Sequence, residues 1–365
     1  MKVLFCGGGT AGHVYPNIAI YEALKKNVPN IKFAYVATEK GIENQIINFK
    51  KFSIPAIGLN KGKALTSIVK FTSKMLTSVK KSKNIIKEFK PDIIIGTGGF
   101  ATFPVIYAGH KLGVKTVVHE SNLIPGKSIK SLEKFVDLIL VNFEGTKDYF
   151  KNQKKIKRVG NPLRSKYFEI NEAQTKEKLG IKKENKVILS FGGSLGAKRI
   201  NDAIISLVEN WLKYNEGTDL FFITGKKDYN RVKKIFMQTG LNKLENVKLL
   251  DFCFNIPEVM ASADIVISRA GAMTISELSQ SGKCSILVPS PNVSNNHQFK
   301  NAELLSSNGA AILMSEDKLY NLVDVVKDLI TDDKKRKKYA EKIKKFTVND
   351  SNKLICKEIL NLVKK

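Results

Sequence analysis

Short apolar runs and helical patterns alternate along the first part of the chain. Apolar runs of this length are typical of strands, and the patterns between them have the period of a helix. The predicted strands are Val3–Cys6, Phe33–Ala37, Ile54–Gly58, Asp92–Gly96, Lys115–His119, Leu138–Val141 and Lys157–Val159, and helical patterns lie near 17–28, 41–48, 64–88, 102–112 and 144–151. This alternation predicts a parallel sheet with helices on both faces.

The alternation stops at Asn161-Pro162-Leu163-Arg164, and a segment rich in lysine and glutamate follows to about Asn185. It then restarts, with predicted strands at Val187–Phe191, Leu220–Thr224, Val247–Leu250, Ile265–Ser268, Ser285–Val288 and Ala311–Met314 and helices at 199–214, 228–238, 273–281, 297–307, 318–330 and 333–345. A last helical pattern at 351–363 places its leucines and isoleucines on one face. The sequence therefore predicts an α/β fold with two doubly wound, Rossmann-like units. A ligand between two such units would lie at the carboxyl ends of both sheets.

A glycine-rich loop follows the first predicted strand, at Gly7-Gly8-Gly9-Thr10-Ala11-Gly12-His13. The order strand, glycine loop, helix directs backbone N–H groups and the positive end of a helix toward an anion. His13 ends this loop, where it could act on whatever the loop binds. The alternative is a histidine that only caps or packs.

Two further glycine loops follow predicted strands. Gly96-Thr97-Gly98-Gly99-Phe100 would bind a second anionic group, or the other half of a pyrophosphate, unless it is a simple turn. Gly192-Gly193-Ser194-Leu195-Gly196-Ala197-Lys198 opens the second unit and matches a dinucleotide fingerprint only loosely. Ser194 could bond a phosphate or cap the following helix.

The stretch Ser268–Leu278 carries the most information in the second unit. A strand ends at Ser268, a turn of small residues follows, and a helix begins near Ala272. Glu277 lies more than one turn into this helix, where its carboxylate can accept hydrogen bonds from the two hydroxyls of a ribose. A glutamate favoured there by the helix dipole is the alternative. The polar loop Pro289–Gln298 suits sugar hydroxyls.

Composition and charge narrow the class of protein. The 365 residues carry a formal net charge of +27, but only six of the 61 basic residues are arginine, and no nucleic-acid-binding motif occurs. We therefore expect no nucleic-acid partner. No run of about 18 apolar residues predicts a membrane-spanning helix, and a strand at the very start leaves no room for a signal peptide. The four cysteines are scattered, as in a reduced cytosolic protein.

Seven short motifs in order resemble the MurG family of peptidoglycan glycosyltransferases, and the likeness spans essentially the whole chain. They are Gly-Gly-Thr-Ala-Gly-His at 8–13, Gly-Thr-Gly-Gly-Phe at 96–100, His119-Glu120-Ser121-Asn122, Gly160-Asn161-Pro162-Leu163-Arg164, Gly192-Gly193-Ser194, the stretch 268–278, and Asn296-His297-Gln298. The chain has Ala11 where many members have glycine. The resemblance implies the GT-B architecture, two Rossmann-like domains that face a cleft, with a last helix crossing back to the first domain.

The resemblance also implies what each domain binds. Residues 1–162 with 347–365 would form an acceptor- and membrane-binding domain, and 163–346 a domain that binds UDP-N-acetylglucosamine. The acceptor would be lipid I, the undecaprenyl-pyrophosphoryl-MurNAc-pentapeptide, and the product lipid II. By motif position, Glu277 would bind the ribose, the Phe252–Asn255 segment with Phe254 the uracil, and Gln298 and Asn122 the sugar. The pyrophosphate would contact Ala272, Met273, Thr274, Ser194 and Arg164, and Ser276 would also bind substrate. Thr10, Ala11 and Gly12 would bind substrate, and the loops with Gly9, Gly98 and Gly99 would face the acceptor diphosphate.

The family transfers the sugar with inversion, which implies one direct displacement. The MurNAc 4-hydroxyl is a weak nucleophile and needs a general base. We expect His13 to be that base, because an unperturbed histidine has a pKa of about 6.5 and can be neutral at physiological pH. No Asp-x-Asp sequence occurs, so we expect no dedicated metal site, and no cofactor is implied.

Lipid I lies in the membrane, so the resemblance implies a peripheral enzyme on the cytoplasmic face. Residues 61–90 carry nine lysines against one glutamate, interleaved with apolar residues such as Phe71, Met75 and Leu76. This composition is typical of a basic amphipathic helix on an anionic leaflet. A helix that packs on its own sheet with solvated lysines is the alternative.

Three other functions remain open from the sequence. Another GT-B enzyme, for example one that acts on diacylglycerol, would share the donor site but not the two N-terminal loops in this form. A UDP-N-acetylglucosamine 2-epimerase would need further acid and base carboxylates, which the sequence does not place. A non-enzymatic basic protein that binds membrane or nucleic acid is the alternative from a different class.

Overall fold

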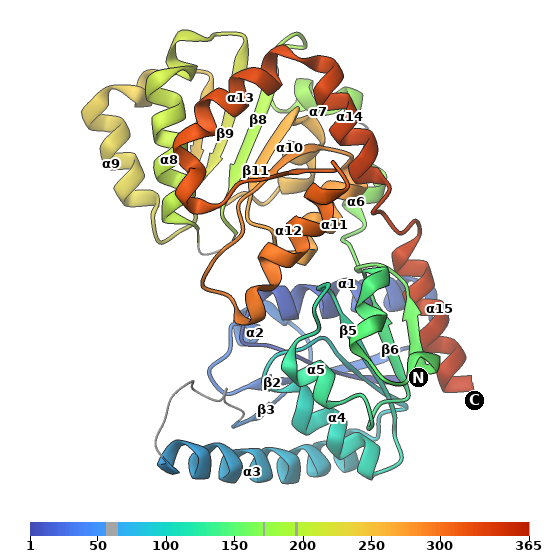
Figure 1. The fold of residues 1–365 in the computed structure, drawn as a ribbon. Helices are drawn as coiled ribbons and strands as arrows, with labels where there is room; N and C mark the ends of the chain where they lie inside the picture. Colours follow the sequence, from blue (N-terminus) through green and yellow to red (C-terminus); the bar gives the residue numbers. More distant parts are fainter. Residues whose placement is uncertain (56–64, 171, 194–195, 365) are drawn as a thin grey trace. The chain divides into compact units, whose positions relative to one another are not determined.

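A computed structural model describes residues 1–55, 65–170, 172–193 and 196–364. The chain divides into two compact units, Met1–Leu163 with Val348–Lys365 and Arg164–Thr347. Each unit is built on one parallel sheet with helices on both faces (Figure 1). The predicted α/β fold with two doubly wound units is confirmed.

The sheet of the first unit has the strand order β3-β2-β1-β4-β5-β6-β7. Its strands are β1 (Lys2–Cys6), β2 (Lys32–Thr38), β3 (Lys51–Ile54), β4 (Ile93–Gly96), β5 (Lys115–Glu120), β6 (Leu138–Val141) and β7 (Ile156–Arg158). Neighbours are parallel, and β1 pairs with β4 so that Cys6 lies opposite Gly96. The two central strands therefore end side by side, and so begin their loops at the same edge of the sheet.

Alternate residues of these strands supply two separate cores. Leu4 and Cys6 pack with helices on one face, while Val3 and Phe5 pack with helices on the other. The helices are α1 (Ala11–Asn27), α2 (Glu43–Ile46), α3 (Leu65–Phe89), α4 (Thr102–Lys111) and α5 (Lys127–Ser131), with 3-10 segments Glu144–Tyr149 and Gln153–Lys155. Because helices bury both faces of this sheet, its strands are continuously apolar in the sequence.

The last helix, α15 (Ser351–Lys364), belongs to the first unit, as predicted. Ile355, Cys356 and Ile359 are buried in the same core cluster as α1. Asn352 bonds both backbone groups of Leu163: its Oδ1 accepts from the Leu163 N–H at 3.0 Å, and its Nδ2 donates to the Leu163 carbonyl at 2.7 Å. The helix thereby holds the residue at which the chain leaves this unit.

The sheet of the second unit has the order β10-β9-β8-β11-β12-β13. Its strands are β8 (Lys186–Phe191), β9 (Thr218–Ile223), β10 (Val247–Leu250), β11 (Ile265–Ser268), β12 (Cys284–Leu287) and β13 (Ile312–Leu313). Its helices are α6 (Lys166–Glu169), α7 (Glu172–Lys178), α8 (Lys198–Asn210), α9 (Tyr229–Thr239), α10 (Ile256–Ser262), α11 (Ala272–Ser281), α12 (His297–Ser307), α13 (Leu322–Thr331) and α14 (Asp333–Lys344), with short 3-10 segments between them.

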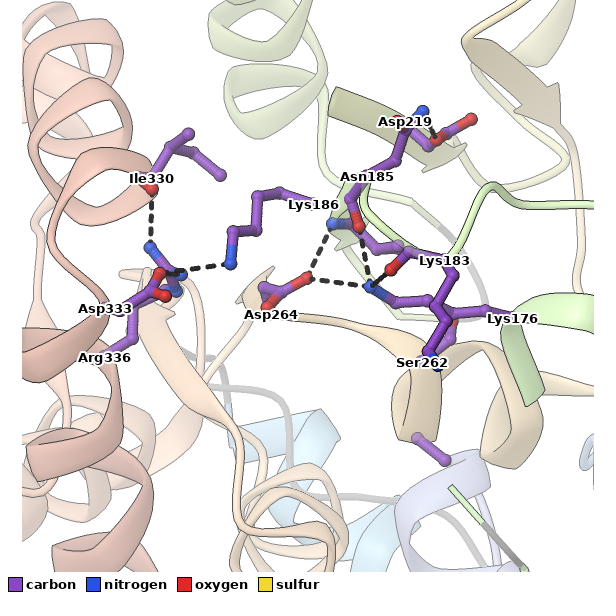
Figure 2. A network of polar contacts seen from close by, with 12 residues as sticks. Lys176, Lys183, Asn185, Lys186, Asp219, Ser262, Asp264, Ile330, Asp333 and Arg336 are labelled. Carbon is purple, nitrogen blue, oxygen red and sulfur yellow. Dashed lines mark hydrogen bonds and ion pairs between the residues drawn. The ribbon is translucent and has the colours of Figure 1, made fainter. Parts of the chain in front are cut away.

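A polar network closes the amino-terminal edge of this second sheet (Figure 2). Asp264, just before β11, accepts the N–H of Val187 at 2.9 Å and faces the ammonium of Lys176 at 3.9 Å. Lys176 also donates to the Asn185 carbonyl at 2.6 Å, and Lys186 pairs with Asp333 at 3.1 Å. The network joins α7 and α14 to the starts of β8 and β11, at the edge opposite the glycine loop.

Several elements differ from the sequence prediction. The strand expected at Ile54–Gly58 is Lys51–Ile54, and residues 56–58 lie outside the described part. The helix expected near 17–28 begins at Ala11, with Pro16 inside it. Only one intrahelical hydrogen bond is lost to this proline, so the helix continues through it. The segment expected to be helical at 144–151 is mostly 3-10. The helices α5, α6, α7 and α10 were not predicted, because helices of seven residues or fewer have too few apolar positions to define a helical face.

Across the described residues, none of the helices is both long and apolar enough to cross a membrane.

We expect Ile359→Ala to destabilise the protein markedly. Ile359 is fully buried in the core cluster that α15 shares with α1, and removal of such a side chain leaves a cavity that costs about 2–5 kcal/mol. Chemical denaturation measures the change. Lys357→Ala, at an exposed position of the same helix, is the matched control, and equal midpoints for the two variants would contradict the packing of α15.

Candidate functional site

Two glycine loops touch at the carboxyl edge of the first sheet. A Cβ atom added to Gly99 would lie 2.0 Å from the carbonyl oxygen of Gly8, and one added to Gly7 would lie 2.7 Å from the Thr97 hydroxyl. Gly99 also has a φ of +84°, which L side chains rarely adopt. The glycines are required because two backbones approach each other closely, and the β1–β4 pairing produces that approach.

His13 lies where these two loops meet. It stands in the first turn of α1, rather than at the end of a loop. Its imidazole packs against Gly98, where an added Cβ would lie 2.8 Å from the ring, and its Nδ1 is 3.1 Å from the hydroxyl of Thr10. The Thr97 hydroxyl donates to the His13 carbonyl at 2.5 Å. The ring is therefore oriented from both loops while it stays partly exposed.

Backbone N–H groups of these loops are partly used inside the protein. The N–H of Gly9 donates to Glu43 at 3.1 Å, and that of Gly98 donates to the Thr102 hydroxyl at 3.1 Å. The ring of Phe100, 51% exposed, lies against Gly9. Sequence reasoning placed Gly9 and Gly98 in anion-facing loops. In the structure their own N–H groups bond side chains. Gly9 and Thr10 are exposed in the first loop, and Gly12 is exposed in the first turn of α1.

The loop after β5 is organised by a second buried glutamate. Glu120 accepts hydrogen bonds from the Asn122 N–H at 2.9 Å, the Asn122 side chain at 3.1 Å and the Gly126 N–H at 2.8 Å. Burial raises the pKa of this carboxyl above its ordinary value. Beside it, burial lowers the pKa of His119 to about 4, and its Nε2 bonds the Gly160 carbonyl at 2.9 Å. Asn122 thus has a fixed position at the same sheet edge as His13.

In the second unit, Arg164, Tyr167 and Glu277 form one cluster. The Arg164 guanidinium lies 5.5 Å from the centroid of the Tyr167 ring. Burial raises the pKa of Glu277 to about 7, and the nearby Arg164 and Tyr167 oppose that rise only in part. Arg164 also acts electrostatically on Cys253, so the segment that follows β10 lies near it. The structure therefore brings together Arg164, Glu277 and the 252–255 segment, and adds Tyr167, which sequence reasoning missed.

Phe254, in that segment, is 85% exposed and packs edge-to-face on Phe252 at 4.8 Å between ring centroids. An aromatic side chain this exposed offers a surface on which a planar base can stack. Ala272, Met273 and Thr274 form the first turn of α11, after Gly271, and Ser276 follows in the second turn. The positive end of this helix is therefore at the carboxyl edge of β11.

A cavity of about 580 Å³ opens beside the glycine loop of this unit. It is lined by Gly192, Gly193, Gly196, Ala197, Lys198, Arg199, Arg269, Ser290, Asn292, Gln298 and Glu316. The Gln298 side chain accepts the Ser290 N–H at 2.8 Å. The Arg269 guanidinium pairs with Glu316 at 2.5 Å and bonds the carbonyls of Val288 and Pro289. Ser194 lies outside the described residues.

Sequence reasoning assigned Gln298 to a sugar but missed the charged residues of this cavity. Lys198, Arg199 and Arg269 give it a basic lining, and Glu316 is the carboxylate among them. Arg269 directly follows β11. A basic residue at the end of a predicted strand could have been recognised from the sequence as a candidate anion-binding residue. Glu316 comes from a distant segment and has no such signal.

The comparisons with known proteins cover both units. Residues 3–141 match the glycosyltransferase family 28 N-terminal domain, and residues 187–355 match the glycosyltransferase family 28 C-terminal domain. A protein of Bacillus cytotoxicus named UDP-N-acetylglucosamine--N-acetylmuramyl-(pentapeptide) pyrophosphoryl-undecaprenol N-acetylglucosamine transferase is 40% identical over 87% of both chains. A Bacillus cereus transferase of the same name, numbered 1, is 38% identical over the whole of both chains. The chain belongs to this glycosyltransferase family, the MurG family.

Solved structures share the fold at lower identity. The MurG crystal structure from Acinetobacter baumannii superposes with a TM-score of 0.75 at 22% identity and covers 99% of both chains. A UDP-GlcNAc 2-epimerase from Neisseria meningitidis, bound to UDP-GlcNAc, superposes with a TM-score of 0.69 at 17% identity over 99% of this chain and all of that one. A transferase and an epimerase thus share this fold, so the fold alone does not distinguish the two activities. The relatives at 38–40% identity are transferases.

Proposed function

We propose that this protein transfers N-acetylglucosamine from UDP-N-acetylglucosamine to the 4-hydroxyl of MurNAc in lipid I and so forms lipid II for peptidoglycan synthesis. The observation that carries this proposal is full-length identity of 38% to a named transferase of that reaction. The glycine loops, His13 and the Arg164–Glu277 cluster lie at the carboxyl edges of their sheets, as this chemistry needs.

The second unit would bind the donor. Glu277 would accept hydrogen bonds from the ribose hydroxyls, and Phe254 would pack on the uracil. The first turn of α11, with Arg164 and Ser194, would bind the pyrophosphate, because a helix N-terminus and a guanidinium both favour anions. Gln298 would contact the sugar. The basic cavity lined by Lys198, Arg199 and Arg269 supports an anionic ligand in this unit.

The first unit would bind the acceptor and supply the base. For its Nε2 to accept a proton, His13 must carry its own proton on Nδ1, and the Thr10 hydroxyl at 3.1 Å is placed to accept it. The imidazole would then take the proton of the MurNAc 4-hydroxyl as that oxygen bonds the anomeric carbon. The bond to UDP breaks in the same step, and Arg164 with the N-terminus of α11 stabilises the leaving diphosphate. Asn122 would contact the sugar, and the loops with Gly9, Gly98 and Gly99 would face the acceptor diphosphate.

Helix α3 would place the protein on the cytoplasmic face of the membrane as a peripheral enzyme. Its inner face buries Ser78, Ser82 and Ile85, whereas Leu76 is 67% exposed. Lys80 and Lys87 are exposed on the same helix. Side chains of residues 65–70 lie outside the described part. Exposed apolar and basic groups on one helix support contact with an anionic leaflet.

We expect the protein to form lipid II from UDP-N-acetylglucosamine and a soluble lipid I analogue, and His13→Ala to abolish most of that turnover. Loss of a general base lowers kcat by about 10²–10⁴-fold, while the affinity for UDP stays unchanged. Turnover is followed by release of UDP, and affinity by calorimetry.

His110→Ala, an exposed histidine of the same unit, is the matched control and should retain activity. Unchanged turnover in His13→Ala would remove His13 from the mechanism. Transfer to diacylglycerol but not to the lipid I analogue would instead overturn the acceptor.

The affinity for uridine should rise with pH between 6 and 8. Only the ionised carboxylate of Glu277 offers acceptors to both ribose hydroxyls, and its pKa is raised to about 7. At pH 6 roughly nine-tenths of that carboxyl is protonated, so binding should be up to about tenfold weaker than at saturating pH. Uridine is the probe because it has no phosphate that titrates. Glu277→Gln should bind weakly with a flat profile, and a flat wild-type profile would contradict the ribose assignment.

The double variant Lys80→Glu, Lys87→Glu should bind anionic vesicles more weakly. Each lysine near an anionic leaflet contributes about 1 kcal/mol, so loss of two lowers partitioning by roughly 30-fold. Sedimentation with phosphatidylcholine vesicles, with and without phosphatidylglycerol, measures this. The control is Lys337→Glu, Lys338→Glu on α14, with the same change in charge. Equal loss in both double variants would argue against docking through α3.

A further inference from the structure

Glu43 is a fully buried carboxylate that no step above uses. It lies in the short helix α2, after β2, and its side chain points back to the first glycine loop. Its Oε1 accepts from the Thr38 N–H at 2.8 Å and the Thr38 hydroxyl at 2.6 Å. Its Oε2 accepts from the Gly9 N–H at 3.1 Å. The side chain therefore joins the end of β2 to the loop that precedes His13.

The surrounding backbone is shaped to admit this carboxylate. A Cβ atom on Gly8 would lie 2.3 Å from Oε1, and one on Gly41 would lie 2.0 Å from the same atom. Two glycines thus make room for one side chain. Since all three contacting groups are donors, a carboxylate, which only accepts, satisfies each of them. A buried charge also needs such hydrogen bonds to offset its lost hydration.

The Gly9 contact fixes the part of the loop on which the reaction depends. Thr10, which follows Gly9, bonds the imidazole of His13, and Gly8 lies directly under Gly99 of the second loop. A shift of Gly9 would therefore move the Thr10 hydroxyl and both glycine loops together.

We propose that Glu43 is a positioning residue for the transfer reaction: its carboxylate holds the first glycine loop in the conformation in which Thr10 orients His13. This inference rests on the proposed function. It assigns to Glu43 an effect on the chemical step and none on donor binding, because every contact of its carboxylate described above lies within the first unit.

Glu43→Gln tests the proposal with the least change in shape. If the amide oxygen keeps the two Thr38 donors, the amide nitrogen faces the Gly9 N–H, and two donors then oppose each other. We expect kcat with the lipid I analogue to fall at least about tenfold, since small displacements of catalytic groups cost this much or more. The Kd for UDP should stay within about twofold of wild type.

Thr38→Val is the matched control, because it removes one hydrogen bond from the same carboxylate and leaves the Gly9 contact intact. It should lower thermal stability but keep kcat within about twofold of wild type. Glu43→Asp keeps an acceptor-only group and should recover part of the kcat lost in Glu43→Gln. Equal kcat in Glu43→Gln and Thr38→Val would overturn the proposal.

Two further outcomes separate the possible failures. If Glu43→Gln does not fold, Gly41→Ala is the second variant, because its new Cβ displaces the intact carboxylate, and it should show the same loss of kcat with unchanged UDP affinity. Wild-type kcat in a folded Gly41→Ala would then overturn the role of Glu43. Absence of turnover in the wild-type protein itself would overturn the proposed function instead.

Discussion

Parallel pairing of β1 with β4 is the constraint on which the first unit depends. In a parallel sheet both strands end at the same edge, and the register that sets Cys6 opposite Gly96 starts their loops side by side. The loops then have no room for a side chain at Gly99, where an added Cβ would meet the carbonyl oxygen of Gly8. The imidazole of His13 fits only because Gly98 lacks a Cβ. The register of the strands therefore determines where glycine is required, and these glycines determine how the imidazole of His13 is oriented.

Buried carboxylates complete this arrangement. A glycine loop has many N–H donors but few side chains to restrain its backbone, so its conformation depends on the acceptors that those donors bond. Glu43 takes donors from the loop after β1, and Glu120 takes donors from the loop after β5. The second unit uses the opposite arrangement, in which Arg269 bonds loop carbonyls and Glu316 together. Carboxyl groups hold the loops of the first unit through their N–H groups, and a guanidinium holds the loop of the second unit through its carbonyls.

Much of the fold was predictable from the sequence because strands buried on both faces read as short apolar runs. Loops that follow predicted strands or precede predicted helices led to His13, Glu277 and Gln298, and the family resemblance led to Arg164; the roles of these residues stay predictions. Glu43, Tyr167 and Glu316 were not predictable. Their roles depend on contacts between distant segments, such as the 34 residues that separate Gly9 from Glu43, and no local pattern records such a contact. The start of α1 was predicted too late, because a proline at position 16 normally marks the beginning of a helix, whereas α1 continues through it.

The position of α15 has a consequence for how the chain is made. The second unit is one continuous stretch, Arg164–Thr347, whereas the first is closed only by residues that follow it. Because a ribosome synthesises the chain from its N-terminal side, the core around Val3 and Phe5 stays without Ile355, Cys356 and Ile359 until all of residues 164–347 have emerged. The first unit is therefore completed after the second, and the apolar face of α1 stays uncovered while the second unit is made.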